Sequence, residues 1–193
     1  MTIECAKELA EITKRNVNEQ DRTQLMEALV LLYDELYNEL NNKYTVRFAH
    51  LESTPLKVGD IVKPDSIIGK IGNTGDSTAT HLHIDCVKGL QTGRYSLLDI
   101  ENNKPEPDPR QLNYFIDEKL FHIKPVITSF YCDPEYQAEL RKVHFGYDLV
   151  PEDRHRTKTH YDIHWNRSIN GRVVAINNDK TGYGLCVYVV FER

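Results

Sequence analysis

The stretch Tyr44-Thr45-Val46-Arg47-Phe48-Ala49-His50-Leu51 marks the point where the chain changes from helical to strand periodicity. Polar and apolar side chains alternate here, and β-branched and aromatic residues are frequent, which predicts a β-strand. In residues 1–42 apolar side chains recur instead at three- and four-residue steps, which predicts an amphipathic helical arm. We expect its stripe to pack on the domain that follows; docking a partner or covering an active site is the alternative. The stripe consists of Leu25, Leu29, Leu32, Tyr33, Leu36, Tyr37 and Leu40.

Further strand signals follow, separated by turn residues. Residues 56–72 predict two short strands around turns at Gly59-Asp60 and Pro64-Asp65. Residues 89–122 include a proline-rich stretch that favours neither a helix nor a central strand, so they predict a loop-rich connector. The predicted fold class is mainly β, with a helical arm over residues 1–42 and one domain over residues 43–193. The other predicted strands cover residues 81–87, 123–131, 171–176 and 185–191.

Composition excludes several classes of function. The chain has 193 residues, of which 40% are hydrophobic, and its net charge is −5 without a long run of lysine or arginine. A nucleic-acid partner is therefore not expected, because phosphate binding needs a concentrated basic face. No apolar stretch approaches the roughly 20 residues of a membrane span, and the first residues do not resemble a secretory signal. The four cysteines are widely spaced, which predicts free thiols rather than a zinc knuckle or a disulfide framework.

Histidines form the most informative pattern. In His81-Leu82-His83 the two imidazoles lie one residue apart on a predicted strand, so both point to the same face. His144 and Asp148 lie four residues apart, with Gly146 between them to allow a bend. A zinc hydrolase needs three protein ligands and one open position. His83, His144 and Asp148 supply such a set, although each residue alone is more simply a hydrogen-bonded or exposed polar side chain.

The surrounding motifs make the combination specific, because the chain resembles the lysostaphin-type (LytM-like) zinc endopeptidases. That family cleaves peptide cross-links in bacterial peptidoglycan. The resemblance implies Zn²⁺ held by His83, His144 and Asp148, with His81 as general base. It implies that His50 stabilises the oxyanion or shares the proton transfer. The matching segments are residues 144–148 for His-x-x-x-Asp, residues 81–83 for His-x-His after the loop at 72–78, residues 48–51 for aromatic-x-His-Leu, the hairpin at 56–62 and the strand at 125–130.

The order of the two motifs is reversed relative to the family. There the His-x-x-x-Asp block comes first, whereas here it follows the His-x-His block. We interpret this as a circular permutation in which residues 43–88 and 123–193 form one domain joined through 89–122, the cut lying in a surface hairpin. The final strand would then lie beside the strand at residues 44–50. The alternative is a homodimer in which two swapped chains close each site.

The expected partner is a peptidoglycan peptide, and the expected place of action is the cell wall outside the cytoplasm. Because no export signal is visible, delivery by a bacteriophage is one interpretation. A rival from another class is a non-catalytic wall-binding or virion structural module that keeps the fold and the metal site. A biotinyl or lipoyl carrier is disfavoured, because both methionines, Met1 and Met26, lie in the predicted arm.

A second group of histidines lies near the end of the chain. His155, His160 and His164, with Asp162, suggest either a second metal site or an exposed histidine-rich loop, and we favour the loop. The aromatic residues Tyr147 and Trp165 are candidates for contact with substrate, although burial is the default for such side chains.

Overall fold

The computed structural model describes residues 42–93, 106–153 and 161–192. The chain divides into two compact units, Met1–Asn41 and Asn42–Arg193. The predicted helical arm therefore lies outside the described residues, and the description that follows concerns the second unit. Within the described residues no helix is both long and apolar enough to span a membrane.

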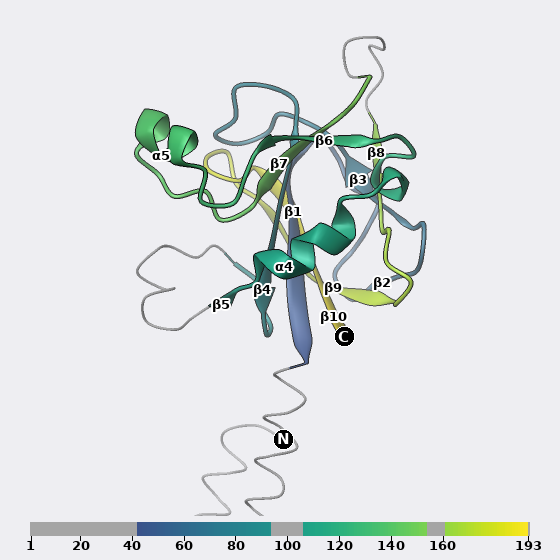
Figure 1. Cartoon of the computed structure of the whole chain (residues 1–193). Coiled ribbons are helices and arrows are strands. Elements are labelled where there is room, and N and C mark those ends of the chain that lie inside the picture. The colour runs from purple at the N-terminus through teal and green to yellow at the C-terminus, as the bar shows by residue number, and fades with distance from the viewer. Residues whose placement is uncertain (1–41, 94–105, 154–160, 193) are drawn as a thin grey trace, which may run out of the picture. The chain divides into compact units, whose positions relative to one another are not determined.

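One antiparallel sheet organises the described domain (Figure 1). Its strand order is β2-β9-β10-β1-β4-β7-β6, and β5 extends the same edge of β4 that β7 occupies. Strands β1 and β4, which carry His50 and the His-x-His motif, lie near the middle. The eight strands are β1 (Lys43–Leu51), β2 (Ile61–Val62), β4 (Leu82–Lys88), β5 (Glu106–Pro107), β6 (Pro125–Ser129), β7 (Tyr147–Pro151), β9 (Gly171–Asn178) and β10 (Leu185–Glu192).

The two faces of the sheet have different characters because side chains alternate along each strand. On β1, Val46 and Phe48 point into the main hydrophobic core, whereas Arg47 lies on the opposite face. On β4, Ile84 joins the core, while His83 lies on the same face as Arg47. The chemistry-bearing residues thus gather on the face turned away from the main core, which includes Phe48, Phe115, Trp165 and Phe191 in edge-to-face contacts.

The predicted connector contributes more structure than expected. Within it, α4 (Pro109–Leu112), η1 (Asn113–Phe115) and η2 (Glu118–Leu120) follow β5. Asp108 caps α4 by accepting a hydrogen bond from the backbone N–H of Arg110, and Pro109 begins the helix where its missing N–H costs nothing. Leu112, Phe115 and Leu120 are fully buried in the core. The proline-rich stretch therefore starts a helical cover over the sheet rather than a plain loop.

The domain also contains a second, two-stranded sheet. β3 (Ile67–Lys70) pairs with β8 (Asp162–His164) in a small second sheet. The turn before β3 holds Asp65 at φ +68, a left-handed conformation that aspartate tolerates better than most residues.

Every strand predicted from the sequence is present, whereas β7, β8 and α5 (Pro134–Leu140) were not predicted. The three cysteines in the described part, Cys86, Cys132 and Cys186, are free thiols as predicted.

Candidate metal centre

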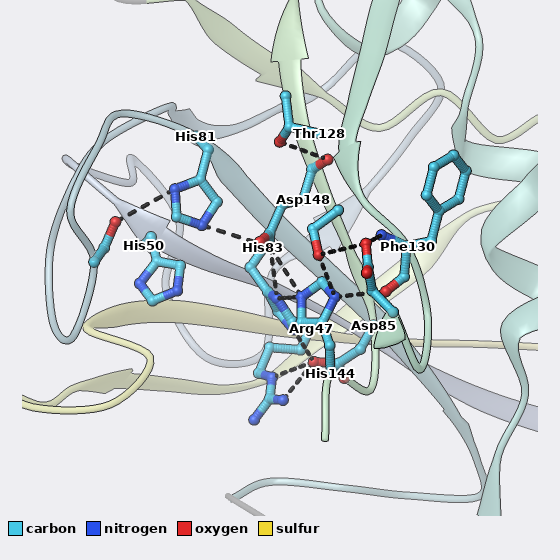
Figure 2. A network of polar contacts seen from close by, with 12 residues as sticks. Arg47, His50, His81, His83, Asp85, Thr128, Phe130, His144 and Asp148 are labelled. Carbon is cyan, nitrogen blue, oxygen red and sulfur yellow. Dashed lines mark hydrogen bonds and ion pairs between the residues drawn. The ribbon is translucent and has the colours of Figure 1, made fainter. Parts of the chain in front are cut away.

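Three predicted ligands meet on the polar face of the sheet (Figure 2). His83 on β4 and Asp148 on β7 are opposite residues in the antiparallel register, so pairing of these strands alone brings them together. His144 precedes β7 and reaches the same point. Asp148 Oδ1 lies 3.0 Å from His83 Nδ1 and 3.1 Å from His144 Nε2, and the two nitrogens are 3.0 Å apart. All three residues come from one chain, so a swapped dimer is not needed to close the site.

The hydrogen bonds of the two histidines fix which nitrogen faces the centre. His144 Nδ1 donates to the carbonyl of Phe130 at 2.8 Å, which leaves the Nε2 lone pair directed at Asp148. His83 Nε2 lies 3.0 Å from Asp85 Oδ2, so a proton on Nε2 leaves the Nδ1 lone pair facing Asp148. A metal-binding histidine commonly donates its other N–H to a carboxylate or a backbone carbonyl. Each ring can therefore keep a proton on its outer nitrogen while the nitrogen that faces Asp148 binds a metal.

Asp85 is a residue of this network that the sequence argument missed. Its carboxylate accepts from His83 and from Arg47, whose Nε lies 2.7 Å from Asp85 Oδ2, and both Arg47 and Asp85 are buried. The Arg47 guanidinium in turn lies 3.6 Å from the ring centroid of Tyr183. The signal was present as spacing: Asp85 is the next same-face position after His81 and His83 on an alternating strand.

Gly146 combines a bend with close packing. The chain bends at this residue, as predicted from the sequence. A Cβ at this position would also lie 2.4 Å from the carbonyl oxygen of Ile84 and 2.8 Å from His83 Nε2. The glycine therefore also lets the segment between His144 and Asp148 pass directly beside the His83 ring.

His81 borders the centre without sharing its tight cluster. Its Nε2 lies 3.5 Å from Asp148 Oδ1, and its Nδ1 donates to the carbonyl of Ala79 at 2.8 Å. The Nε2 atom is then the unprotonated nitrogen of the neutral ring. His81 thus presents a proton acceptor at the edge of the cluster.

His50 approaches from the end of β1. Its ring centroid lies 4.8 Å from that of His81, and its Nδ1 donates to the carbonyl of Thr74 at 2.7 Å. Its backbone has φ +60, and its N–H donates to Tyr183 at 2.9 Å. Burial lowers the pKa of His50 to about 4, more than the hydrogen bond to Thr74 raises it. His50 is therefore neutral near pH 7, with Nε2 as an acceptor.

Neighbouring groups lower the pKa of Asp148 and raise the pKa of His83. Burial disfavours the ionised form of Asp148, but without a metal the imidazoles of His144 and His83 can take up a proton on the facing nitrogen, and their hydrogen bonds and charge hold the pKa of the carboxyl well below its usual range. Burial likewise disfavours protonation of His83, yet the carboxylates of Asp148 and Asp85 raise its pKa. The site concentrates negative charge around two imidazoles, which is an environment suited to a cation.

A cleft of about 460 Å³ opens over these residues. Helix α5 forms one wall, and Tyr136 stacks on the His144 ring with centroids 4.5 Å apart. Tyr183, from the turn between β9 and β10, lies 5.2 Å from the His83 ring. These two tyrosines, rather than the predicted Tyr147 and Trp165, line the cleft; Trp165 is fully buried in the core. The Gly182-Tyr183-Gly184 sequence, a ring displayed on a tight turn, was the available signal for Tyr183.

Comparison with known families supports a peptidase. The model of peptidase family M23 matches residues 19–94, so this part of the chain is similar to that family. No curated protein and no solved structure matches the chain. The family match and the antiparallel sheet confirm the resemblance and the mainly β fold class predicted from the sequence, whereas the circular permutation stays a prediction. The matched region includes His50, His81 and His83.

The donor set of this centre fits a zinc ion. Two imidazole nitrogens and one carboxylate oxygen are typical ligands of catalytic zinc, which keeps a further position open. Donor atoms around tetrahedral zinc are separated by about 3.3 Å, from bond lengths of about 2.0–2.2 Å. The observed separations of 3.0 and 3.1 Å are close to that value. His83, His144 and Asp148 could therefore hold the ion, with the cleft on its open side.

The second predicted histidine group does not assemble as expected within the described residues. His155 and His160 lie outside them. His164 and Asp162 lie on β8, and neither lines the cleft. His164 instead contacts His122 and Asp65, two residues that the sequence argument did not single out.

Proposed function

We propose that this protein is a zinc-dependent endopeptidase that hydrolyses peptide cross-links of bacterial peptidoglycan. The observation that carries the proposal is the convergence of His83, His144 and Asp148 at the floor of a cleft, with His81 and His50 beside them. The substrate class is supported by the resemblance to lysostaphin-type endopeptidases. An enzyme with this substrate acts on the cell wall, outside the cytoplasm.

The ligand residues hold the ion, and other residues move the proton. When bound, zinc supplies Lewis acidity and makes a water molecule acidic enough to lose a proton near neutral pH. His83, His144 and Asp148 would be its protein ligands. Asp85 keeps His83 in the correct tautomer through the 3.0 Å contact at Nε2, and the Phe130 carbonyl does the same for His144.

His81 is the proposed general base. Its Nε2 has a free lone pair, because Nδ1 donates to Ala79, and it lies at the edge of the ligand cluster. It would accept a proton from the water that adds to the scissile carbonyl carbon. The same proton then passes to the leaving nitrogen as the C–N bond breaks. A positioned acid–base group of this kind contributes roughly 10²–10⁴-fold to the rate.

His50 is better suited to accept a proton than to donate to an oxyanion in the resting enzyme. Its Nδ1–H is engaged by Thr74, and burial keeps the ring neutral. Of the two roles open from the sequence, sharing the proton transfer with His81 therefore has the stronger support. Donation to an oxyanion would first require protonation of Nε2.

The proposed circular permutation has support in the sheet. β10 lies antiparallel to β1, and its last residue, Glu192, is opposite the first residue of β1, Lys43. A hairpin between those two positions would restore the motif order of the family. The family match ends at residue 94, before His144 and Asp148, as expected if only one of two reordered halves aligns in sequence.

The test is digestion of purified cell walls that differ in cross-bridge type. Zinc-loaded enzyme should release muropeptides with new amino termini, and a chelator should abolish the release. His83→Ala should lose both zinc and activity, whereas His81→Ala should keep zinc and slow turnover by roughly 10²–10⁴-fold. Stoichiometric zinc without cleavage of any wall type would favour a non-catalytic wall-binding or virion module instead.

A further inference from the structure

Three side chains that are far apart in sequence meet beside the small β3–β8 sheet. Asp65 lies in the turn before β3, His122 follows η2, and His164 ends β8. We propose that Asp65, His122 and His164 form a second site for a divalent transition metal, separate from the centre in the cleft. This inference does not depend on the proposed peptidase activity.

The donor atoms already converge on one carboxylate oxygen. Asp65 Oδ1 lies 2.7 Å from His122 Nε2 and 3.3 Å from His164 Nδ1. The two imidazole rings are stacked, with centroids 3.8 Å apart and an interplanar angle of 20°. One donor atom from each residue lies within 4.8 Å of the others. An ion placed among them needs only small side-chain movements to gain two nitrogen ligands and one oxygen ligand.

Backbone hydrogen bonds hold the scaffold of this site. The N–H of Asp65 donates to the carbonyl of Trp165 at 2.8 Å, and the N–H of Trp165 donates to the carbonyl of Ser66 at 2.8 Å. The turn is thereby fixed against the end of β8, next to His164. Asp65 and His122 both have positive φ, at +68° and +54°. Aspartate and histidine adopt this left-handed conformation more readily than most residues, so both can occupy these turns.

The chemistry of the three residues defines the class of ion. Imidazole nitrogen suits zinc, nickel and copper, whereas magnesium and calcium prefer all-oxygen sites. The hydrogen bond from His122 holds the pKa of the Asp65 carboxyl below its usual range, so the carboxylate is ionised at neutral pH. The side chains of Asp65 and His122 are more than half exposed, while His164 is mostly buried. Water can therefore reach the ion and complete its coordination.

The second site lies away from the cleft. None of its three residues lines the cleft over His83. In Figure 1, β3 and β8 lie on the right, whereas α5, which borders the cleft, lies on the left. An ion here would tie together the turn before β3, the segment after η2 and the end of β8. We therefore infer a stabilising role, in which metal binding favours the folded state by mass action.

Counting zinc in the full-length chain tests the proposal. After removal of metal by chelator and equilibration with zinc, the wild-type chain should hold two ions by elemental analysis. His122→Ala and Asp65→Asn should each hold one; asparagine keeps the left-handed backbone accessible at position 65. The double variant His155→Ala/His160→Ala is the matched control, since it also removes histidines, and it should retain two ions. His122 is exposed, so its loss should not impair folding.

A variant that lacks the cleft centre separates this inference from the proposed function. His83→Ala/Asp148→Ala should still bind one zinc ion, and that ion should raise its melting temperature. Adding His122→Ala should abolish both the binding and the shift. The proposal is overturned if His122→Ala holds as much zinc as wild type, or if the His155/His160 control loses the ion instead. If the cleft does not bind zinc, the result differs: the zinc content of the chain would then be the same with and without His83→Ala.

Discussion

His83 and Asp148 are opposite residues on the adjacent antiparallel strands β4 and β7, and their side chains meet at 3.0 Å between Nδ1 and Oδ1. Strand register therefore determines the geometry of the candidate metal centre. A shift of one residue would turn either side chain to the core face of the sheet. Packing of that core, through Ile84 and Leu149 on the same strands, thus holds the two ligands together.

Asp85→Asn should weaken zinc binding at the cleft. The substitution removes the charge that keeps the proton on His83 Nε2 and that pairs with the Arg47 guanidinium. Loss of such a supporting partner typically lowers metal affinity by about 10–100-fold. Zinc affinity is measured by competition with a chromogenic chelator. Asp76→Asn is the control, because it removes an exposed carboxylate at the same cleft and should leave the affinity unchanged.

Gly146→Ala should reduce both stability and zinc affinity. The new Cβ would lie 2.4 Å from the Ile84 carbonyl oxygen and 2.9 Å from His83 Cε1, so the strand and the ligand ring must separate. Overpacking of this kind costs about 1–3 kcal/mol in the free energy of unfolding. Thermal denaturation and zinc titration measure the two effects. Gly93→Ala is the matched control, since a Cβ there meets nothing within 4 Å; equal behaviour of the two variants would contradict the close-packing role.

The sequence predicted most strands and the three clustered residues because both depend on local patterns. Alternation identified β1 and β4, and the short motifs identified His83, His144 and Asp148, which the structure brings together as candidate ligands. β7 was missed because its apolar run is brief and its pairing partners lie far away in sequence. The helical cover over residues 109–120 is not evident from the sequence, because proline disfavours a helix interior but is favourable at the first helical position, where Pro109 lies.

The remaining site residues could not be predicted, because tertiary contacts bring them to the sites and no local sequence pattern indicates those contacts. Tyr136 reaches His144 from α5, and Arg47 reaches Asp85 across the β1–β4 pair. His122 reaches Asp65 and His164 only because the segment after η2 lies beside the turn before β3. A single sequence holds no information about which of many exposed histidines acquire such neighbours.

Tyr136→Ala should lower zinc affinity, whereas Tyr136→Phe should not. The ring of Tyr136 stacks on His144 and restrains the orientation of that ligand. Aromatic pairs contribute about 0.5–1.5 kcal/mol, which corresponds to roughly 2- to 10-fold in affinity. Calorimetric zinc titration distinguishes the two variants. If phenylalanine is as damaging as alanine, the hydroxyl rather than the ring is responsible.

His50 should titrate far below an ordinary histidine in metal-free protein. Its pKa is lowered to about 4 from the 6.5 of an unperturbed imidazole, because burial disfavours the charged ring. Between these values the unfolded chain binds one more proton than the folded chain, so stability rises with pH across this window and is lost as the pH falls. The full difference is on the order of 3 kcal/mol.

Two measurements check this behaviour. The Cε1–H resonance of His50 should show a midpoint near pH 4, and a midpoint at or above 6 would refute control by burial. His50→Asn should flatten the loss of stability between pH 6.5 and pH 4. Asparagine is the appropriate replacement because it tolerates the positive φ at this position and offers a donor to the Thr74 carbonyl.

Reordering the chain tests both the permutation and the closure of the site within one molecule. Lys43 and Glu192 are opposite residues at the ends of β1 and β10, so a two-residue Asn-Gly turn in place of Arg193 and Asn42 can join them as a hairpin. New termini are opened within residues 94–105 of the connector, and residues 1–41 are omitted.

The resulting chain has the motif order of the family, with His144 and Asp148 before His81 and His83. It should be monomeric by light scattering and bind zinc at the cleft as tightly as a chain that starts at residue 42 in the natural order. If the natural-order chain folds and binds zinc while the reordered chain does neither, the two half-domains are not related by permutation.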